Sequence, residues 1–174
     1  LKYLNQRYPT MISIKFWLVV VGLVAIFYTN SISGQPLKDD AGLKPFLNKK
    51  YELKSSDENF DEIMKILGVG YVTRNLGRLA KPVMELSEDN GVYTLTSEST
   101  FRNTVTKFKI GEEFDDETPD GRKVRSTFTQ EKNKLIQVQR GDKVTTIVRE
   151  FADNEVKVTV KVGDIASVRI YSAL

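Results

Sequence analysis

Arg149 stands in an apolar stretch of sequence that alternates in the manner of a β-strand. Alternation places it on the same face as Ile147 and Phe151, with Val148 and Glu150 on the opposite face. A guanidinium on an apolar face is unfavourable unless a partner pairs with it. The pattern therefore indicates that Arg149 is paired with another group, unless it is an ordinary surface arginine.

A second arginine, Arg169, is separated from Tyr171 by one residue near the end of the chain. The two side chains share one face of a predicted strand, but Val168 and Ile170 on the other face are apolar. Periodicity alone turns Arg169 toward solvent. Planar guanidinium donors and a neutral phenol hydroxyl are nonetheless groups that suit a carboxylate. The residues alone leave both alternatives open.

Other chemistry is restricted by residue types that the chain lacks. Its 174 residues include no His and no Cys, which excludes Ser/His/Asp and Cys/His catalysis, imidazole or thiolate metal sites and disulfides. The adjacent pairs Glu112–Glu113 and Asp115–Asp116 cannot act on one substrate bond, because neighbours on a strand point to opposite faces. We therefore expect neither an enzyme nor a bound cofactor or metal.

Size and charge indicate one domain without a nucleic-acid partner. The chain has 174 residues, of which 40% are hydrophobic, enough for a single sizeable core. The net charge is +3, but acidic and basic residues are interspersed, as in residues 107–120, and do not form a basic tract.

A hydrophobic segment near the N-terminus has the three parts of a secretory signal peptide. Lys15 precedes an apolar run from Phe16 to Phe27, and small polar residues follow around Ser33. The run is shorter than the roughly 20 residues of a membrane-spanning helix. We interpret residues 11–33 as a signal peptide and expect a secreted protein, with a cytoplasmic location as the alternative if the leader is not used.

The segments on either side of this leader show no periodicity. Residues 1–10 precede Met11 and form an upstream segment of unknown status. Residues 34–45 combine Gly, Pro and charge, which predicts a flexible lead-in. The folded domain is then expected over residues 46–174. A buried N-terminal strand or helix is the alternative reading of the apolar run.

From Pro82 onward, short segments rich in β-branched and aromatic residues are separated by turn signals. The signals are Asn90-Gly91, Asp120-Gly121, Gly141-Asp142, Asp153-Asn154 and Gly163-Asp164. Over residues 156–161, valines alternate with Lys and Thr, so we expect one face of the sheet to be exposed to solvent. A meander this long leaves unpaired edges unless it closes, and a strand from Phe46 to Leu53 would close it. The prediction is an all-β fold, an antiparallel up-and-down β-barrel.

Two short helices are predicted between that first strand and the meander. Residues 59–67 begin with Asn59, a capping type, and repeat apolar side chains at helical spacing. Gly68 and Gly70 break this helix, and a second one runs from Tyr71 to Leu79. Their apolar faces must lie on the barrel, most naturally over one open end. Plain core packing without a gating role is the alternative.

The helical segment, residues 59–82, resembles the helix-turn-helix of the fatty acid-binding protein family, the intracellular lipid-binding proteins of the calycin, or lipocalin-like, superfamily. Residues 50–53 match that family's opening strand. Further agreement occurs at Ser99–Thr104, Gly111–Phe114, Asp120–Val124 and Arg169–Tyr171. The resemblance runs from about Phe46 to the C-terminus. It implies a ten-stranded barrel that is closed by two helices and holds a lipid in an internal cavity.

The resemblance also implies a set of ligand-binding residues. Arg149, Arg169 and Tyr171 stand where the family binds the lipid head group. The other implied positions are Phe101 at the portal, Met64, Val69, Thr73 and Pro82 along the cavity mouth or tail path, and Asp120 with Arg122 as an interior polar pair. Phe60 and Met64 are equally well explained as lid-to-barrel packing.

The implied function is non-covalent binding and transport of a long-chain fatty acid or a similar hydrophobic carboxylate. A retinoic acid carrier of the same fold is the main alternative, and a protein-interaction module is another. Arg74, Arg78 and Lys81 on the lid are candidates for transient contact with anionic membranes, unless they form an ordinary solvated face. We expect a monomer.

Overall fold

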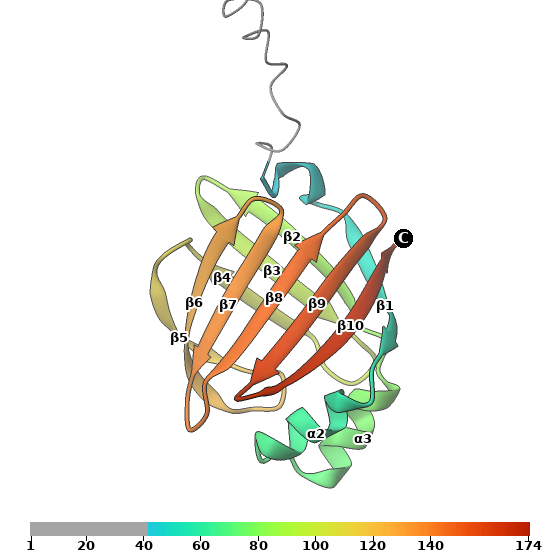
Figure 1. Cartoon of the computed structure of the whole chain (residues 1–174). Coiled ribbons are helices and arrows are strands. Elements are labelled where there is room, and N and C mark those ends of the chain that lie inside the picture. The colour runs from blue at the N-terminus through green and yellow to red at the C-terminus, as the bar shows by residue number, and fades with distance from the viewer. Residues whose placement is uncertain (1–41) are drawn as a thin grey trace, which may run out of the picture. The chain divides into compact units, whose positions relative to one another are not determined.

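Ten antiparallel strands form one continuous sheet in the computed structural model, which describes residues 42–174 (Figure 1). The strands are β1 (Lys50–Ser56), β2 (Val83–Asp89), β3 (Val92–Glu98), β4 (Thr104–Phe108), β5 (Glu113–Glu117), β6 (Lys123–Glu131), β7 (Lys134–Arg140), β8 (Thr145–Phe151), β9 (Glu155–Val162) and β10 (Ile165–Ala173). The helices are α2 (Asn59–Ile66) and α3 (Tyr71–Leu79), and a short 3-10 turn, η2, covers Lys44–Phe46. The predicted leader at residues 11–33 lies outside the described residues.

The sheet curls into a nearly closed barrel. Strand β1 pairs with both β2 and β10, so the first and last strands of the fold meet. Strands β4 and β5 are the two edges of the sheet and do not pair with each other. The predicted up-and-down barrel is therefore confirmed, but it has an unpaired junction, which we call the seam, between β4 and β5.

All five predicted turns join consecutive strands. At the β2–β3 turn, Asn90 and Gly91 have φ values of 52° and 81°, the left-handed conformation that an Asn-Gly pair accommodates. The β6–β7 turn was not predicted, because it contains no glycine. In the structure Lys132 adopts a φ of 52° at this turn. A non-glycine residue in this conformation is not foreseeable from turn composition.

One end of the barrel is filled by side chains. Tyr51 is 0% exposed, and Leu43 and Phe151 are each 1% exposed. The ring of Phe46 stacks on Phe151 at a centroid distance of 5.8 Å. The expected first strand, from Phe46 to Leu53, begins later than predicted: Phe46 lies in η2, and the strand begins at Lys50. Leu43 falls within the expected lead-in but belongs to the core, so the fold begins before the expected boundary at residue 46.

The two helices cover the opposite end (Figure 1). Helix α2 is attached to β10, since the Asp57 carboxylate accepts hydrogen bonds from Ser167 Oγ at 2.6 Å and from the Val168 amide at 2.7 Å. Asn59 does not cap the helix as expected; its Nδ2 donates to the carbonyl of Ala166 at 3.0 Å. Helix α2 buries Ile63, whereas α3 buries no residue.

The direction of the strands determines which loops share the helical end. Because successive strands are antiparallel, the loops at 99–103, 118–122, 141–144 and 163–164 lie at the same end of the barrel as the helices. No helix within residues 42–174 is long and apolar enough to cross a membrane. Within the same residues, no group of three acidic side chains is arranged to hold a metal ion.

Candidate ligand-binding site

A cavity of about 450 Å³ lies inside the barrel and reaches the helices. Ten of the eleven residues expected at a ligand site line it: Phe60, Met64, Thr73, Pro82, Phe101, Asp120, Arg122, Arg149, Arg169 and Tyr171. Val69 is not among the lining residues. It is 7% exposed and buried, and its carbonyl accepts a hydrogen bond from Arg74 Nη1 at 2.9 Å. The cavity thus gathers residues from both helices, the nearby loops and the last strands.

Arg149 projects into the cavity from β8, on the face that its neighbours Ile147 and Phe151 share. Its Nη2 donates to Gln137 Oε1 at 3.1 Å, while its Nη1 is buried and has no partner among the described residues. Burial lowers the pKa of Arg149 to about 10, although Tyr171 and Asp116 act in the opposite direction. The guanidinium therefore keeps its charge at neutral pH and has an unused donor.

Arg169 also faces the cavity, in contrast to what strand periodicity alone indicates. The guanidinium carbon lies 4.2 Å from the centroid of the Phe60 ring on α2 and 5.9 Å from that of Tyr171. Its Nε is buried without a partner in the described part of the chain. The aromatic ring that the helix brings over the cation provides an environment that the strand's own sequence does not reveal.

Asp120 and Arg122 form the expected polar pair, in the loop between β5 and β6. Arg122 donates through Nε and Nη2 to the two carboxylate oxygens, at 2.5 and 3.2 Å. The Asp120 side chain is 7% exposed. Burial raises the pKa of Asp120, but hydrogen bonds from Arg122 and Thr118 outweigh it, so the pKa lies below its ordinary value.

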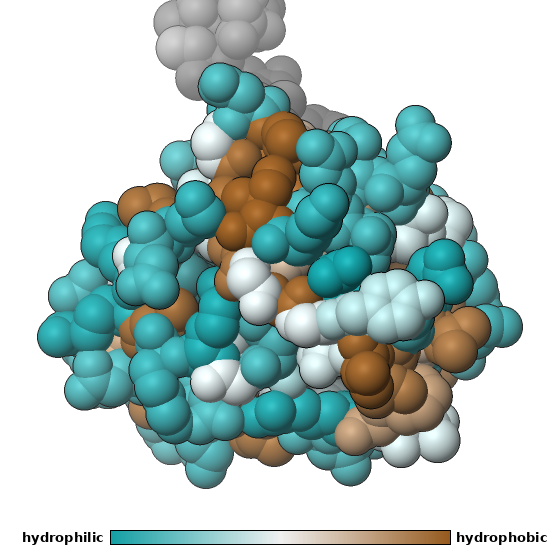
Figure 2. Space-filling model, turned by 90° about the horizontal axis from the view of Figure 1, so that it is seen from below, coloured by the Kyte–Doolittle hydropathy of each residue, from teal (hydrophilic) through white to brown (hydrophobic). Residues whose placement is uncertain are grey.

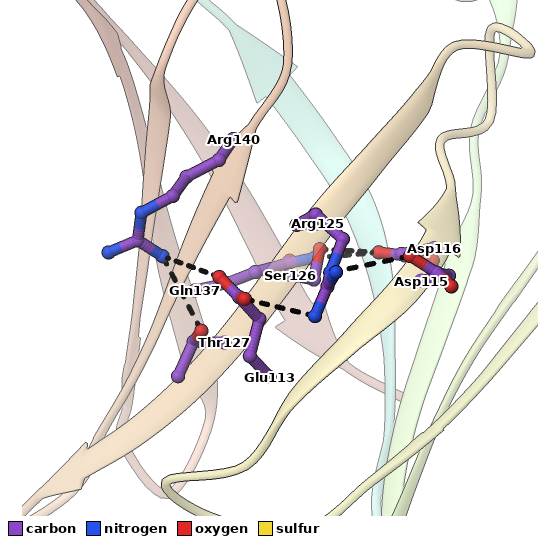
Figure 3. A network of polar contacts seen from close by, with 8 residues as sticks. All are labelled: Glu113, Asp115, Asp116, Arg125, Ser126, Thr127, Gln137 and Arg140. Carbon is purple, nitrogen blue, oxygen red and sulfur yellow. Dashed lines mark hydrogen bonds and ion pairs between the residues drawn. The ribbon is translucent and has the colours of Figure 1, made fainter.

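Several polar residues on the inner wall were not expected from the sequence. Ser126 is 0% exposed and Gln137 is 4% exposed, and both belong with Asp116 to a hydrogen-bonded cluster (Figure 3). On β7 the inward residues include Gln137, whereas the apolar Ile136 and Val138 face outward. If the more apolar face of β7 were taken as the inner face, Ile136 and Val138 would be placed inside the barrel, which is wrong. The register between β7 and β8 identifies the face of Gln137 as the inner face.

The sequence profile of the lipocalin / cytosolic fatty-acid binding protein family matches residues 49–173. The chain belongs to this family. It is 49% identical over 126 residues to a fatty acid-binding protein of Tyrophagus putrescentiae, which covers 72% of this chain and 95% of the relative. It is also 47% identical over 133 residues to a muscle fatty acid-binding protein of Schistocerca gregaria, covering 75% of this chain and 98% of the relative.

Solved structures agree with this membership. A brain fatty acid-binding protein of Drosophila melanogaster superposes with a TM-score of 0.70 at 52% identity, covering 74% of this chain and 99% of that one. A Schistosoma mansoni fatty acid-binding protein in complex with arachidonic acid superposes with a TM-score of 0.73 at 40% identity, covering 76% and 98%. The barrel and helices described above are therefore those of the fatty acid-binding protein family, a family of binding and not of catalytic proteins.

The two helices α2 and α3, which we call the lid, and the loop beside them expose several apolar side chains. Tyr71, Val72 and Leu79 on α3 are 70%, 72% and 67% exposed, and Phe101 in the neighbouring loop is 49% exposed. Figure 2 views the molecule from the helical end and shows apolar areas between polar ones. Of the basic residues expected to face membranes, Arg74 is engaged within the lid, because its Nε donates to Asp61 at 3.0 Å.

Proposed function

We propose that this chain binds a long-chain fatty acid, or a similar hydrophobic carboxylate, non-covalently inside the barrel and transports it. The supporting observation is a pair of buried guanidinium nitrogens on the wall of the cavity, Arg149 Nη1 and Arg169 Nε, for which residues 42–174 provide no hydrogen-bond partner. Buried donors without acceptors are unfavourable, and a carboxylate is the acceptor that matches two guanidinium groups best. Relatives named as fatty acid-binding proteins support the same ligand class.

The head group would lie between the two arginines, with Tyr171 as a neutral donor. The acyl chain would run along Met64, Thr73 and Pro82 toward Phe101. Each buried methylene contributes about 0.8 kcal/mol before ordering and desolvation are counted. Binding therefore gains most of its free energy from the tail, and the arginines select the head group.

No chemical step is part of this proposal. The chain has no His or Cys. On β5 the neighbouring carboxylates have different partners, since Asp115 pairs with Arg125 and Asp116 accepts a hydrogen bond from Ser126. Transport then requires only that the lid and the Phe101 loop move apart and return. We propose that the protein acts as a monomer. Because Arg74 is paired with Asp61, we propose that Arg78 and Lys81 are the basic residues that contact anionic lipid.

The cellular location depends on residues 11–33, which remain a predicted signal peptide. The match to a family described as cytosolic supports the cytoplasmic alternative. If the leader is used, N-terminal sequencing of the mature protein should begin near Gly34 or Gln35. An intact leader on protein recovered from the cytosol would contradict secretion.

The proposed ligand can be tested with Arg169→Leu and two ligands of equal chain length, oleate and oleyl alcohol. Oleate should lose about 1 to 3 kcal/mol of binding free energy, because the carboxylate loses a charged donor. Oleyl alcohol should lose little, because burial of its tail is unchanged. Titration calorimetry measures both affinities. Equal losses for acid and alcohol would show that Arg169 does not anchor the head group.

The natural ligand can be identified without prior assumption. Native mass spectrometry of freshly purified protein should reveal a bound fatty acid, and a cavity that stays empty would favour a protein-interaction role. Competition between oleate and retinoic acid then separates the fatty acid carrier from a retinoid carrier of the same fold. Stronger displacement by retinoic acid would replace the proposed ligand class.

A further inference from the structure

A chain of polar side chains crosses four neighbouring strands on the inner wall of the barrel. It consists of Asp116 on β5, Ser126 on β6, Gln137 on β7 and Arg149 on β8. Figure 3 shows its first three members. Each step joins diagonal neighbours: Asp116 is paired in register with Val124, two residues from Ser126. Diagonal neighbours on one face lie within reach of long polar side chains.

The contacts along this chain form one continuous series. Ser126 Oγ donates to Asp116 Oδ2 at 2.7 Å, and Gln137 Nε2 donates to Ser126 Oγ at 3.3 Å and to Asp116 Oδ2 at 3.4 Å. At the other side of the same amide, Gln137 Oε1 accepts from Arg149 Nη2 at 3.1 Å. Gln137, at 4% exposure, therefore joins the acidic residue to the head-group arginine.

The carboxylate gives this chain a direction. An ionised Asp only accepts hydrogen bonds, so the amide group of Gln137 must turn its NH₂ toward Asp116 and its oxygen toward Arg149. The reversed amide would place an oxygen against the carboxylate and an NH₂ against the guanidinium. Both contacts would be repulsive inside the barrel, where charges are poorly screened. Asp116 thus fixes the amide orientation that Arg149 requires.

Arg169 has no comparable support. Within residues 42–174 its guanidinium takes part in no hydrogen bond or ion pair and rests on the rings of Phe60 and Tyr171. Stacking permits a cation to rotate and slide over the ring, whereas the bond to Gln137 orients Arg149 in one direction. The two arginines therefore differ: one is held by the wall, and the other is held against the lid.

We infer that Gln137 is a positioning residue for the head-group site: oriented by Asp116 and Ser126, it holds Arg149 so that Nη1 is presented to the ligand's carboxylate. This inference rests on the proposed function, since it assigns a role toward the same carboxylate. It predicts that Gln137 affects discrimination between acid and alcohol, which a residue that only fills space would not affect.

The experiment compares Gln137→Leu with the matched control Gln139→Leu, using oleate and oleyl alcohol on the full chain. Gln139 lies on the same strand and face, lines the same cavity and is 5% exposed, but it makes no hydrogen bond to Arg149. Gln137→Leu should weaken oleate binding by about 3- to 10-fold and oleyl alcohol binding by less than about 2-fold. Gln139→Leu should leave the ratio of the two affinities as in the parent protein.

A second variant tests the same inference through charge. Gln137→Glu places a carboxylate against Arg149 and neutralises it, so oleate binding should fall by about 10- to 100-fold while oleyl alcohol still binds. Circular dichroism and thermal unfolding verify that each variant is folded. Alcohol binding provides the same control on the cavity itself.

The outcomes separate the two proposals. A parent protein that binds oleate and oleyl alcohol equally well would overturn the proposed carboxylate site, whatever the variants do. If the parent protein prefers oleate, two results would overturn the role of Gln137 alone. In the first, Gln137→Leu and Gln137→Glu both retain the preference for oleate. In the second, Gln139→Leu loses as much of this preference as Gln137→Leu does.

Discussion

At the end of the barrel away from the helices, Leu43, Tyr51 and Phe151 are at most 1% exposed, whereas at the helical end α3 has no buried residue. The first end is held by contacts among large apolar side chains. The second buries fewer large apolar side chains, Ile63 among them, and has in addition individual polar contacts, such as Asp57 with Ser167 and Arg74 with Asp61. Apolar burial in a packed core contributes far more to stability than exposed ion pairs do.

The difference indicates a division of roles between the two ends. Because the packed end stabilises the barrel, we expect the helical end to open without unfolding the remainder. A carrier whose ligand enters through a lid needs this arrangement, because the moving part must have a low opening free energy. The following three predictions test the contrast, in order of decreasing effect.

Phe151→Ala should have the largest effect on stability. The ring contacts Phe46 and Tyr51 at the packed end, so its removal should lower the free energy of unfolding by about 3 to 5 kcal/mol. Leu79→Ala on α3, where the side chain is 67% exposed, should change it by less than about 0.5 kcal/mol. Urea denaturation measures both, and similar losses would contradict the contrast.

Asp120→Asn tests the ion pair between Asp120 and Arg122 at the helical end. The pKa of Asp120 in the folded state is below its ordinary value of 3.8, so its stabilising contribution is complete above the unfolded-state pKa and disappears as pH falls through the folded-state pKa. The variant should be less stable than the parent by roughly 1 kcal/mol at pH 7. The difference should vanish in strong acid; a difference independent of pH would show that charge is not its cause.

Arg74→Leu should affect ligand exchange more than stability. Arg74 joins the two helices through Asp61 and the Val69 carbonyl, and such a partly exposed contact contributes about 0.2 to 1 kcal/mol. Release of a fluorescent fatty acid in stopped flow should therefore accelerate by about 2- to 5-fold. Arg78→Leu removes an equal charge from an exposed position on the same helix and should leave release unchanged. Equal acceleration by both variants would assign the effect to charge alone.

Much of the fold follows from local sequence. The Asn-Gly and Gly-Asp turns have chemistry that favours tight reversals, and the alternating valines at 156, 158 and 160 face the interior as expected. The boundaries of α3 also agree with the prediction, since Gly70 precedes it and Pro82 follows shortly after it. These features depend on interactions between residues that are close in the chain.

The site was less predictable because its polarity contradicts the usual relation between hydrophobicity and burial. Arg169 and Gln137 face inward, while their apolar neighbours Ile170 and Ile136 face outward. The orientation of Arg169 followed from resemblance, and the role of Gln137 required the register between strands that are separated in sequence. The residue types around a cavity must suit a ligand as well as the packing of the core, so the degree of burial alone does not determine which residue stands there.

The seam between β4 and β5 has a consequence for the size of the barrel. A ring of strands paired at every junction can change its girth only by breaking backbone hydrogen bonds. Here the two edges are joined by no ladder, and the Arg102–Glu117 ion pair at 2.9 Å connects the loop before β4 to β5 through side chains. The ring of Phe108 on β4 also stacks on Phe128 of β6 at a centroid distance of 3.6 Å. We therefore expect a ligand too bulky for the cavity of about 450 Å³ to separate these side-chain contacts at the seam before it breaks any ladder.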